Sequence, residues 1–257
     1  MNEQLRAGGK AEAPDYDTLL ANRFLKVYDL KNAPGGHYFE ASRREGDRIT
    51  AFMEDSSFKK LLPDAVTVAV ILEDLKGPET DKNVSRDAAG GGAYADLPSE
   101  PLLLLNYEFR YPVGRELLSP PAGLIDPGDA EPPHGGADDD ISYPDPVLRA
   151  AAREISEETG LRVLKGDRLF KVTQAAFSSP GMTDESNALA CAVLKGHSVS
   201  ELTHCGAEGT ESFGEFELLT RAGAKAILKA GTDARGNWFS AYTWIVLLYF
   251  VSGLWQE

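Results

Sequence analysis

The chain has 257 residues, of which 42% are hydrophobic and 26% are charged, a composition typical of a globular protein with a sizeable core. Its 40 acidic and 26 basic side chains give a net charge of −14, which opposes general binding to nucleic acid or to an anionic membrane. Two cysteines outside any CxxC pattern and four scattered histidines exclude a disulfide scaffold and a structural zinc site.

The N-terminal part of the chain predicts no secretory signal, because MNEQLRAGGKAEAPDYD has no apolar run before its charges. A cytoplasmic protein is therefore expected. Further on, two runs rich in β-forming residues lie within Phe24–Ile49 and flank the turn residues Asn32-Ala33-Pro34-Gly35-Gly36. This pattern predicts an antiparallel β-hairpin.

Two apolar runs predict buried strands. Ala65–Leu75 is rich in β-branched residues, and Pro101–Tyr107 contains a run of leucines. Residues 77–100 between them are rich in Gly, Asp and Ser, so we expect a long loop with no packing of its own.

The best-bounded element of the sequence is a helix. Asp145 provides an N-cap, Pro146 suits the first helical position, and Gly160 ends the run of helix-forming residues. The preceding segment, Asp129–Asp145, is crowded with Pro, Gly and Asp and is too polar to order itself. We expect a disordered insertion there.

The C-terminal part is expected to form three strands and a helix, in the order Phe170–Ala176, Asn187–Leu194, Phe216–Leu219 and Ala222–Lys229. After them, Trp238–Trp255 carries no charge and approaches the length of a membrane span. Its uninterrupted apolar core is only Trp244–Val251, and no basic residue follows it. These features favour a buried terminal helix over a membrane anchor.

Three carboxylates share one face of the predicted helix at Pro146. Glu154, Glu157 and Glu158 are spaced i, i+3 and i+4, and like charges this close destabilise a helix unless a cation neutralises them. Oxygen ligands of this kind suit Mg²⁺ or Mn²⁺. The alternative is a solvated acidic face paired with Arg149 and Arg153, and the spacing alone does not decide between the two.

The run Arg153–Leu161, REISEETGL, resembles the end of the Nudix box, REUxEExGU, where U is a bulky aliphatic residue. Upstream, Pro121–Asp129, PAGLIDPGD, is similar to the opening of that box. The family has a Glu shortly before the Arg, whereas here residues 130–152 separate Asp129 from Arg153. Either Asp129, or Asp145 with the insertion looped out, stands in for that Glu.

The resemblance implies an α/β fold, a Nudix-type α/β/α sandwich with a mixed sheet, preceded by the N-terminal antiparallel β-hairpin. It divides the chain into an N-terminal β segment, residues 1–62, and a catalytic domain, residues 63–257, with the insertion at about 129–145. Two other segments are similar to the ADP-ribose pyrophosphatase branch of the family. Tyr107–Val113 resembles its QFRxP segment, and Ser179–Glu185, SPGMTDE, resembles its SPGxTxE loop.

The resemblance also assigns roles to individual residues. Mg²⁺, or Mn²⁺, is expected to bind Glu154, Glu157, Glu158 and the carbonyl oxygen of Ala122. Glu185 is expected to activate the attacking water, although it could equally be an ordinary loop carboxylate. Arg153 is expected to pair with Glu157 one turn on and to fix it in place.

Three more residues are expected to bind the substrate. Arg110 and Arg43 have the chemistry to grip a diphosphate, and Tyr38 is placed to stack on the base unless it packs into the core. In relatives of this branch the N-terminal segment is exchanged between subunits. A homodimer is therefore expected, in which Tyr38 and Arg43 serve the partner's site.

The expected activity is Mg²⁺-dependent hydrolysis of the pyrophosphate bond of ADP-ribose or a related nucleoside diphosphate sugar, giving a nucleoside monophosphate and a sugar phosphate. Two alternatives stay open. One is the same chemistry on another nucleoside diphosphate compound, such as NADH, a dinucleoside polyphosphate or coenzyme A. The other is a non-catalytic Nudix module that senses a nucleotide. Neither nucleic acid nor a membrane is an expected partner.

Overall fold

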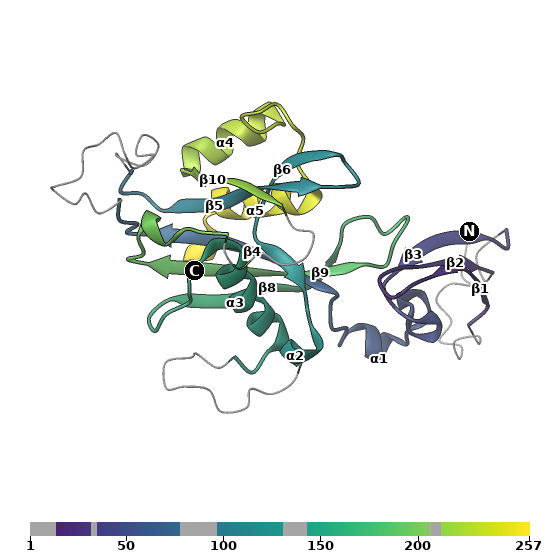
Figure 1. The fold of residues 1–257 in the computed structure, drawn as a ribbon. Coiled ribbons are helices and arrows are strands. Elements are labelled where there is room, and N and C mark those ends of the chain that lie inside the picture. The colour runs from purple at the N-terminus through teal and green to yellow at the C-terminus, as the bar shows by residue number, and fades with distance from the viewer. Residues whose placement is uncertain (1–13, 32–34, 78–96, 131–142, 205, 207–211) are drawn as a thin grey trace. The chain divides into compact units, whose positions relative to one another are not determined.

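The structure is a computed structural model that describes residues 14–31, 35–77, 97–130, 143–204, 206 and 212–257 (Figure 1). The chain divides into two compact units. Unit 1 consists of Met1–Asp64 and Gln174–Asn187, and unit 2 consists of Ala65–Thr173 and Ala188–Glu257. The first segment ends close to the boundary expected after residue 62. The second segment of unit 1 had been assigned to the catalytic domain.

Unit 1 contains a three-stranded antiparallel sheet in the order β1-β2-β3. Its strands are β1 (Tyr16–Ala21), β2 (Lys26–Leu30) and β3 (Tyr38–Ser42). The predicted hairpin is confirmed, because Lys26 pairs with Ser42 and Leu30 pairs with Tyr38. Of its predicted turn, residues 32–34 lie outside the described residues. Strand β1 was not predicted, because its burial pattern is almost wholly exposed and it lacks an apolar alternation.

The second segment of unit 1 contacts the free edge of β3. The amide of Ala41 donates to the carbonyl oxygen of Met182 at 2.9 Å, and Ala41 forms a parallel bridge with Thr183. A small core beside the sheet contains Tyr28, Leu30 and Ile49. A single-turn helix, α1 (Asp55–Phe58), follows.

Unit 2 is built on a seven-stranded sheet with the order β10-β5-β4-β9-β8, in which β6 pairs with β5 and β7 pairs with β4. The strands are β4 (Ala65–Glu73), β5 (Leu102–Arg110), β6 (Arg115–Ser119), β7 (Ala122–Leu124), β8 (Arg168–Phe177), β9 (Ser186–Lys195) and β10 (Phe213–Leu219). All five predicted strands of this sheet are confirmed. Of the predicted loop between the first two, residues 78–96 lie outside the described residues.

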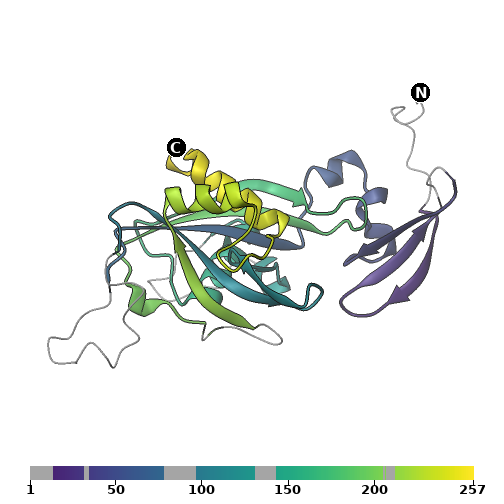
Figure 2. The same cartoon turned by 90° about the horizontal axis from the view of Figure 1, so that it is seen from above.

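Alternate side chains of β4 enter two different cores, as strand geometry requires. Val66, Val68, Val70 and Leu72 pack with residues of helix α3 (Pro146–Thr159). Ala69 and Ile71 pack with residues of α4 (Arg221–Ala230) and α5 (Ala241–Ser252). Helices therefore cover both faces of the sheet (Figures 1 and 2). The predicted α/β fold class, with a layer of helices on each side of the sheet, is confirmed.

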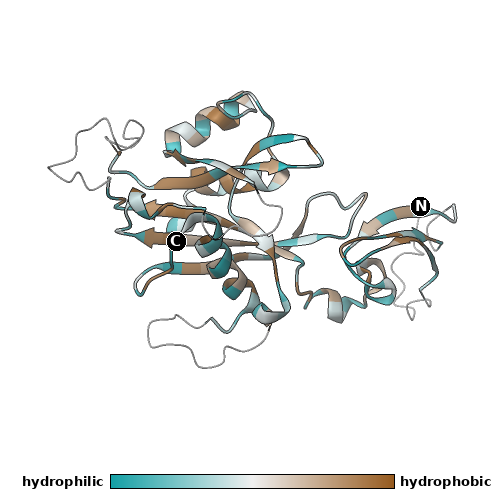
Figure 3. Ribbon diagram, viewed as in Figure 1, coloured by the Kyte–Doolittle hydropathy of each residue, from teal (hydrophilic) through white to brown (hydrophobic). Residues whose placement is uncertain are grey.

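The hydropathy of unit 2 follows this layering. The central strands are strongly hydrophobic, whereas α3 alternates between polar and apolar positions (Figure 3). Strands such as β4 and β5 are therefore visible in the sequence as apolar runs, since both of their faces are buried. By contrast, β7 is three residues long and was not predicted as a strand.

The apolar C-terminal run forms α5, a helix of 12 residues. One face is buried through Val246, Leu247 and Phe250, while Leu248 on the opposite face is 54% exposed. The expected terminal helix is thus present and buried along one face. Of the helices in the described ranges, none combines the length and the apolarity that crossing a bilayer requires.

Candidate active site

Helix α3 presents the predicted carboxylates from unit 2. Its N-terminus is capped by Asp145, whose Oδ1 accepts the amide of Val147 at 2.9 Å, and its C-terminus ends at Gly160 in the left-handed conformation. One face packs on the sheet through Val147 and Ile155, both fully buried. Both predicted helix boundaries are confirmed.

Glu158 is the most buried of the three carboxylates, at 2% exposure. Its Oε1 accepts the amide of Ala122 at 3.2 Å, and its Oε2 accepts the Nδ2 of Asn106 at 3.1 Å. Burial raises the pKa of Glu158 to about 9, and the nearby Glu154 adds to this rise. Among the described residues, no Lys, Arg or His side chain forms an ion pair with Glu158.

Glu154 packs against the backbone of β7. It is 5% exposed, and a Cβ atom built on Gly123 would lie 2.0 Å from its Oε1. Only glycine at position 123 leaves room for this carboxylate. Two buried carboxylates from successive turns of α3 therefore reach neighbouring residues of one short strand, Glu154 at Gly123 and Glu158 at Ala122.

Arg153 joins several acidic groups beside this pair. Its Nη1 lies 2.8 Å from Glu157 and 2.8 Å from Glu154, and its Nη2 lies 3.0 Å from Asp129. Its Nη2 also donates to the carbonyl oxygen of Leu124 at 2.8 Å. The predicted ion pair between Arg153 and Glu157 is confirmed.

The structure places Asp129 and Asp145, the two candidates from the sequence resemblance, in different surroundings. Asp129 is buried in a one-turn helix, α2 (Pro127–Ala130), and pairs with Arg153. Asp145 instead caps α3 and pairs with Lys171. Asp129 therefore belongs to the carboxylate group around Arg153. The expected insertion does not begin at Asp129, and residues 131–142 of it lie outside the described residues.

The predicted three-carboxylate metal site is not formed as a cluster. Within the part of the chain that the structure describes, no group of three His, Cys, Asp or Glu side chains is arranged to hold a metal ion. Arg153 pairs with both Glu157 and Glu154, so Glu154 and Glu158 are a pair by their burial, and Glu158 is the one of the three without an ion pair among the described residues. Arg149 does not neutralise the helix face, because its side chain donates to the carbonyl oxygens of Asp129 and Tyr143.

Two residues near the pair were not predicted. Asn106 is 1% exposed on β5, and its Oδ1 has no hydrogen-bond partner among the described residues. Glu108, two residues along the strand, pairs with Arg110, whose side chain is 44% exposed. Asn106 is the first polar residue after the apolar run Leu102–Leu105, and a polar side chain there signals a buried hydrogen-bonding role.

The other predicted residues lie in unit 1, where the structure brings them onto adjoining segments. Arg43 donates through Nε to Glu185 Oε2 at 3.1 Å. The Tyr38 hydroxyl donates to the carbonyl oxygen of Gly181 at 2.8 Å, and the Tyr38 side chain is 44% exposed. Tyr38 is therefore not a core residue. Glu185 is therefore a loop carboxylate that is paired with an arginine.

The neighbouring Arg44 links the two segments of unit 1. Its Nη1 donates to the carbonyl oxygen of Asp184 at 2.8 Å, and its Nη2 lies 2.7 Å from Asp64. Glu40 lies nearby on β3, is 8% exposed, and has an Oε1 without a hydrogen-bond partner in the described ranges. Burial, with a contribution from Asp184, raises the pKa of Glu40 to about 7, while Arg44 opposes the rise.

We expect Glu40→Gln to change how stability depends on pH. A carboxyl group whose pKa is higher in the folded than in the unfolded chain binds more protons when folded, so wild-type stability falls from about pH 4.5 to about pH 7. The variant lacks this loss, and its melting temperature relative to wild type should rise over that interval and then level off. Over the same interval the free energy of unfolding of the variant, relative to wild type, should rise by on the order of 1 to 2 kcal/mol. If thermal unfolding showed a constant difference in melting temperature between the variant and wild type from pH 5 to pH 8, the raised pKa of Glu40 would be contradicted.

Comparison with protein-family models and with curated protein sequences found no match to this chain.

Proposed function

We propose that the chain is a metal-dependent hydrolase of the Nudix type that cleaves the pyrophosphate bond of ADP-ribose or a related nucleoside diphosphate sugar. The products are a nucleoside monophosphate and a sugar phosphate. The observation that carries the proposal is the buried pair Glu154 and Glu158, set against the backbone of Ala122 and Gly123.

A purely structural role explains this pair less well. A solvated acidic face would be exposed and balanced by arginines, whereas Glu154 and Glu158 are buried, Arg149 binds elsewhere, and Arg153 pairs with Glu154 but not with Glu158. Removing a carboxylate from water is costly unless a cation or strong hydrogen bonds compensate. Glu158 has two hydrogen bonds from neutral groups, so an added cation is the missing partner that this environment favours.

The donor set fits Mg²⁺ better than a transition metal. It consists of hard oxygen ligands, namely the carboxylates of Glu154 and Glu158 with the unpartnered Oδ1 of Asn106 beside them. Mg²⁺ is commonly held by one or two carboxylates together with water and substrate phosphates, so a cluster of three protein carboxylates is not required. We keep the carbonyl oxygen of Ala122 in the proposed ligand set, with Mn²⁺ as the alternative ion.

In the proposed mechanism, Glu154 and Glu158 would hold the ion, and Arg153 keeps Glu157 and Asp129 in place beside them. When bound, Mg²⁺ would withdraw negative charge from the pyrophosphate. Glu185 would accept a proton from the attacking water through Oε1, since Oε2 accepts from Arg43. Arg110 and Arg43 would hold the phosphates, and Tyr38 the base. The roles in unit 1 rest on the resemblance of the Ser179–Glu185 segment.

The experiment that tests this proposal is turnover by the purified chain with Mg²⁺ over a panel of compounds. It should contain ADP-ribose, other nucleoside diphosphate sugars, NADH, a dinucleoside polyphosphate and coenzyme A. Hydrolysis of a sugar nucleotide to a nucleoside monophosphate is the expected result. Faster hydrolysis of another compound would identify that compound as the substrate instead. Saturable binding of nucleotides without turnover of any compound would favour the sensor alternative.

The proposal includes a homodimer in which Tyr38 and Arg43 serve the partner's site. Arg43→Ala and Glu158→Gln subunits should each be inactive alone and regain activity when mixed, because one of the two shared sites then carries neither substitution. Light scattering should give twice the chain mass. Verified subunit exchange without recovery of activity would place Arg43 in its own subunit's site or outside the site.

A further inference from the structure

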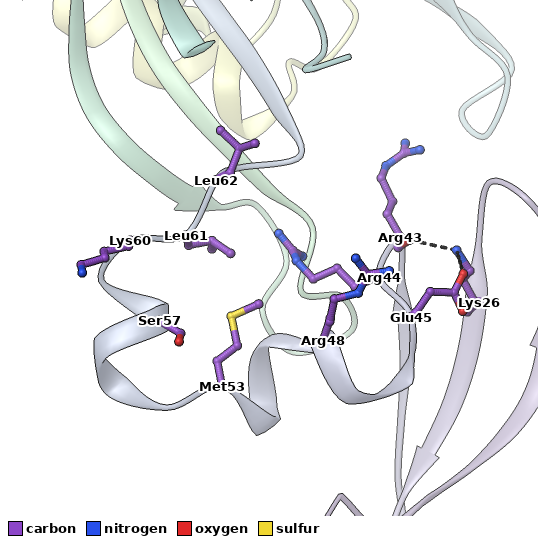
Figure 4. Close-up of a pocket in the computed structure, with 10 residues that line it drawn as sticks. All are labelled: Lys26, Arg43, Arg44, Glu45, Arg48, Met53, Ser57, Lys60, Leu61 and Leu62. Atoms are coloured by element: carbon purple, nitrogen blue, oxygen red, sulfur yellow. Dashed lines mark hydrogen bonds and ion pairs between the residues drawn. The ribbon is translucent and has the colours of Figure 1, made fainter. Parts of the chain in front are cut away.

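Unit 1 contains a cavity of about 530 Å³ (Figure 4), within the size range of small-molecule sites. Its charged lining is markedly unbalanced. The ionisable residues that line it are five cations and one acid, Lys26, Arg43, Arg44, Arg48, Lys60 and Glu45. This concentration of positive charge stands out in a chain with a net charge of −14.

Some of these cations already have partners. Lys26 pairs with Glu45 at 3.0 Å and donates to the carbonyl oxygen of Arg43 (Figure 4). Arg44 is compensated by Asp64 and Asp184, outside the lining. Lys26 and Arg44 are therefore held in place by their partners, and their charges are largely neutralised before a ligand binds.

Three cationic groups remain available to a ligand. Within the described part of the chain, the side chains of Arg48 and Lys60 form no ion pair or hydrogen bond, and Arg43 uses only its Nε. Figure 4 shows Lys60 directed away from the arginines, on a long side chain that can rotate toward a bound anion. An anion in this cavity would meet guanidinium groups suited to bidentate binding of phosphate oxygens.

The remaining lining restricts the class of ligand. Met53, Leu61 and Leu62 provide apolar surface in the same cavity, so the site suits a molecule with both an anionic and an apolar part. The strongly acidic chain disfavours a nucleic acid, whose many phosphates would be repelled beyond this patch. We propose that the cavity of unit 1 binds a phosphorylated small molecule, with Arg48 and Lys60 contacting its phosphate. This inference rests on Arg48 and Lys60, which the proposed function does not use, and it does not depend on that function.

Inorganic pyrophosphate is the probe that isolates the anionic part of the ligand. Calorimetric titration of the full chain, with EDTA present to exclude metal-dependent binding, should show one saturable site that weakens as salt is raised. Arg48→Gln and Lys60→Gln should each weaken binding at least about fivefold, because each removes a charge-assisted hydrogen bond. Circular dichroism should show that both variants keep the wild-type fold.

Matched controls lie in the same unit. Arg23→Gln and Lys59→Gln remove the same charges from exposed positions outside the cavity lining, and should leave the affinity within about twofold of wild type. An equal loss of pyrophosphate affinity in the controls and in the cavity variants would show a general effect of charge and would overturn the proposed site. Absence of saturable binding below about 10 mM pyrophosphate would also overturn it. Since the readout is binding without metal, failure here is distinct from failure of the hydrolase proposal.

Discussion

Glu158→Gln is expected to lower kcat at least about a hundredfold while the chain stays folded. The substitution replaces an ionisable carboxyl group of the buried pair with a neutral amide of the same shape, so the side chain can no longer supply a negative charge to a metal ion. Its amide oxygen can still accept the amide of Ala122. Its new NH₂ group would face Asn106 Nδ2, so the Asn106 amide must turn over to present Oδ1, which has no partner among the described residues, as the acceptor. The measurement is the initial rate with saturating Mg²⁺. A circular dichroism spectrum and a melting curve show whether the variant is folded.

A matched control removes a carboxylate of the same kind from the surface of unit 2. Glu215 has a side chain that is 86% exposed and lies 3.4 Å from Arg235, so Glu215→Gln should keep wild-type activity. If Glu158→Gln retained activity near that of wild type with Mg²⁺, Glu158 would not be a metal ligand. The buried pair would then be a structural feature of the helix and strand.

The elements most accurately predicted from the sequence are those whose ends and periodicity are local. Helix α3 is defined by Asp145 and Gly160, two residues whose capping roles depend on the adjacent backbone. Strand β4 is visible because both of its faces are buried. Strand β7 was missed since its three residues are held by pairing with β4, a contact between distant parts of the sequence that no local pattern reports.

The candidate site likewise has features that local sequence predicts and features that depend on contacts between distant residues. The spacing of the three glutamates predicts a shared helix face, but it does not show that Glu154 and Glu158 reach the backbone of β7 while Glu157 pairs with Arg153. That distinction depends on Arg153, which reaches Glu157 on its own helix and Asp129 on another segment. Asn106 and Gly123 complete the surroundings of the pair from two strands. Their roles depend on sheet register, which needs the tertiary structure.

Gly123→Ala is expected to lower kcat roughly ten- to a hundredfold with only a modest loss of stability. The new methyl group would lie 2.0 Å from Glu154 Oε1 and 2.2 Å from its Cδ, so the carboxylate must move away from β7. The atoms that clash are the end of a flexible side chain, and the cost to folding should be about 1 to 2 kcal/mol. Activity depends far more steeply on position, because a metal ligand displaced by about 1 Å no longer holds the ion and substrate in register.

Gly128→Ala is the matched control, since it adds the same methyl group a few residues away, where nothing lies within 4 Å. It should keep wild-type kcat and a wild-type dependence on Mg²⁺ concentration. Gly123→Ala should instead need more Mg²⁺ for half-maximal rate, because Glu154 is displaced while Glu158 keeps its contact with Ala122. Equal behaviour of the two alanine variants would mean that the position of Glu154 against β7 is irrelevant to catalysis. A loss of kcat without any change in the Mg²⁺ dependence would assign Glu154 to positioning of the substrate rather than to metal binding.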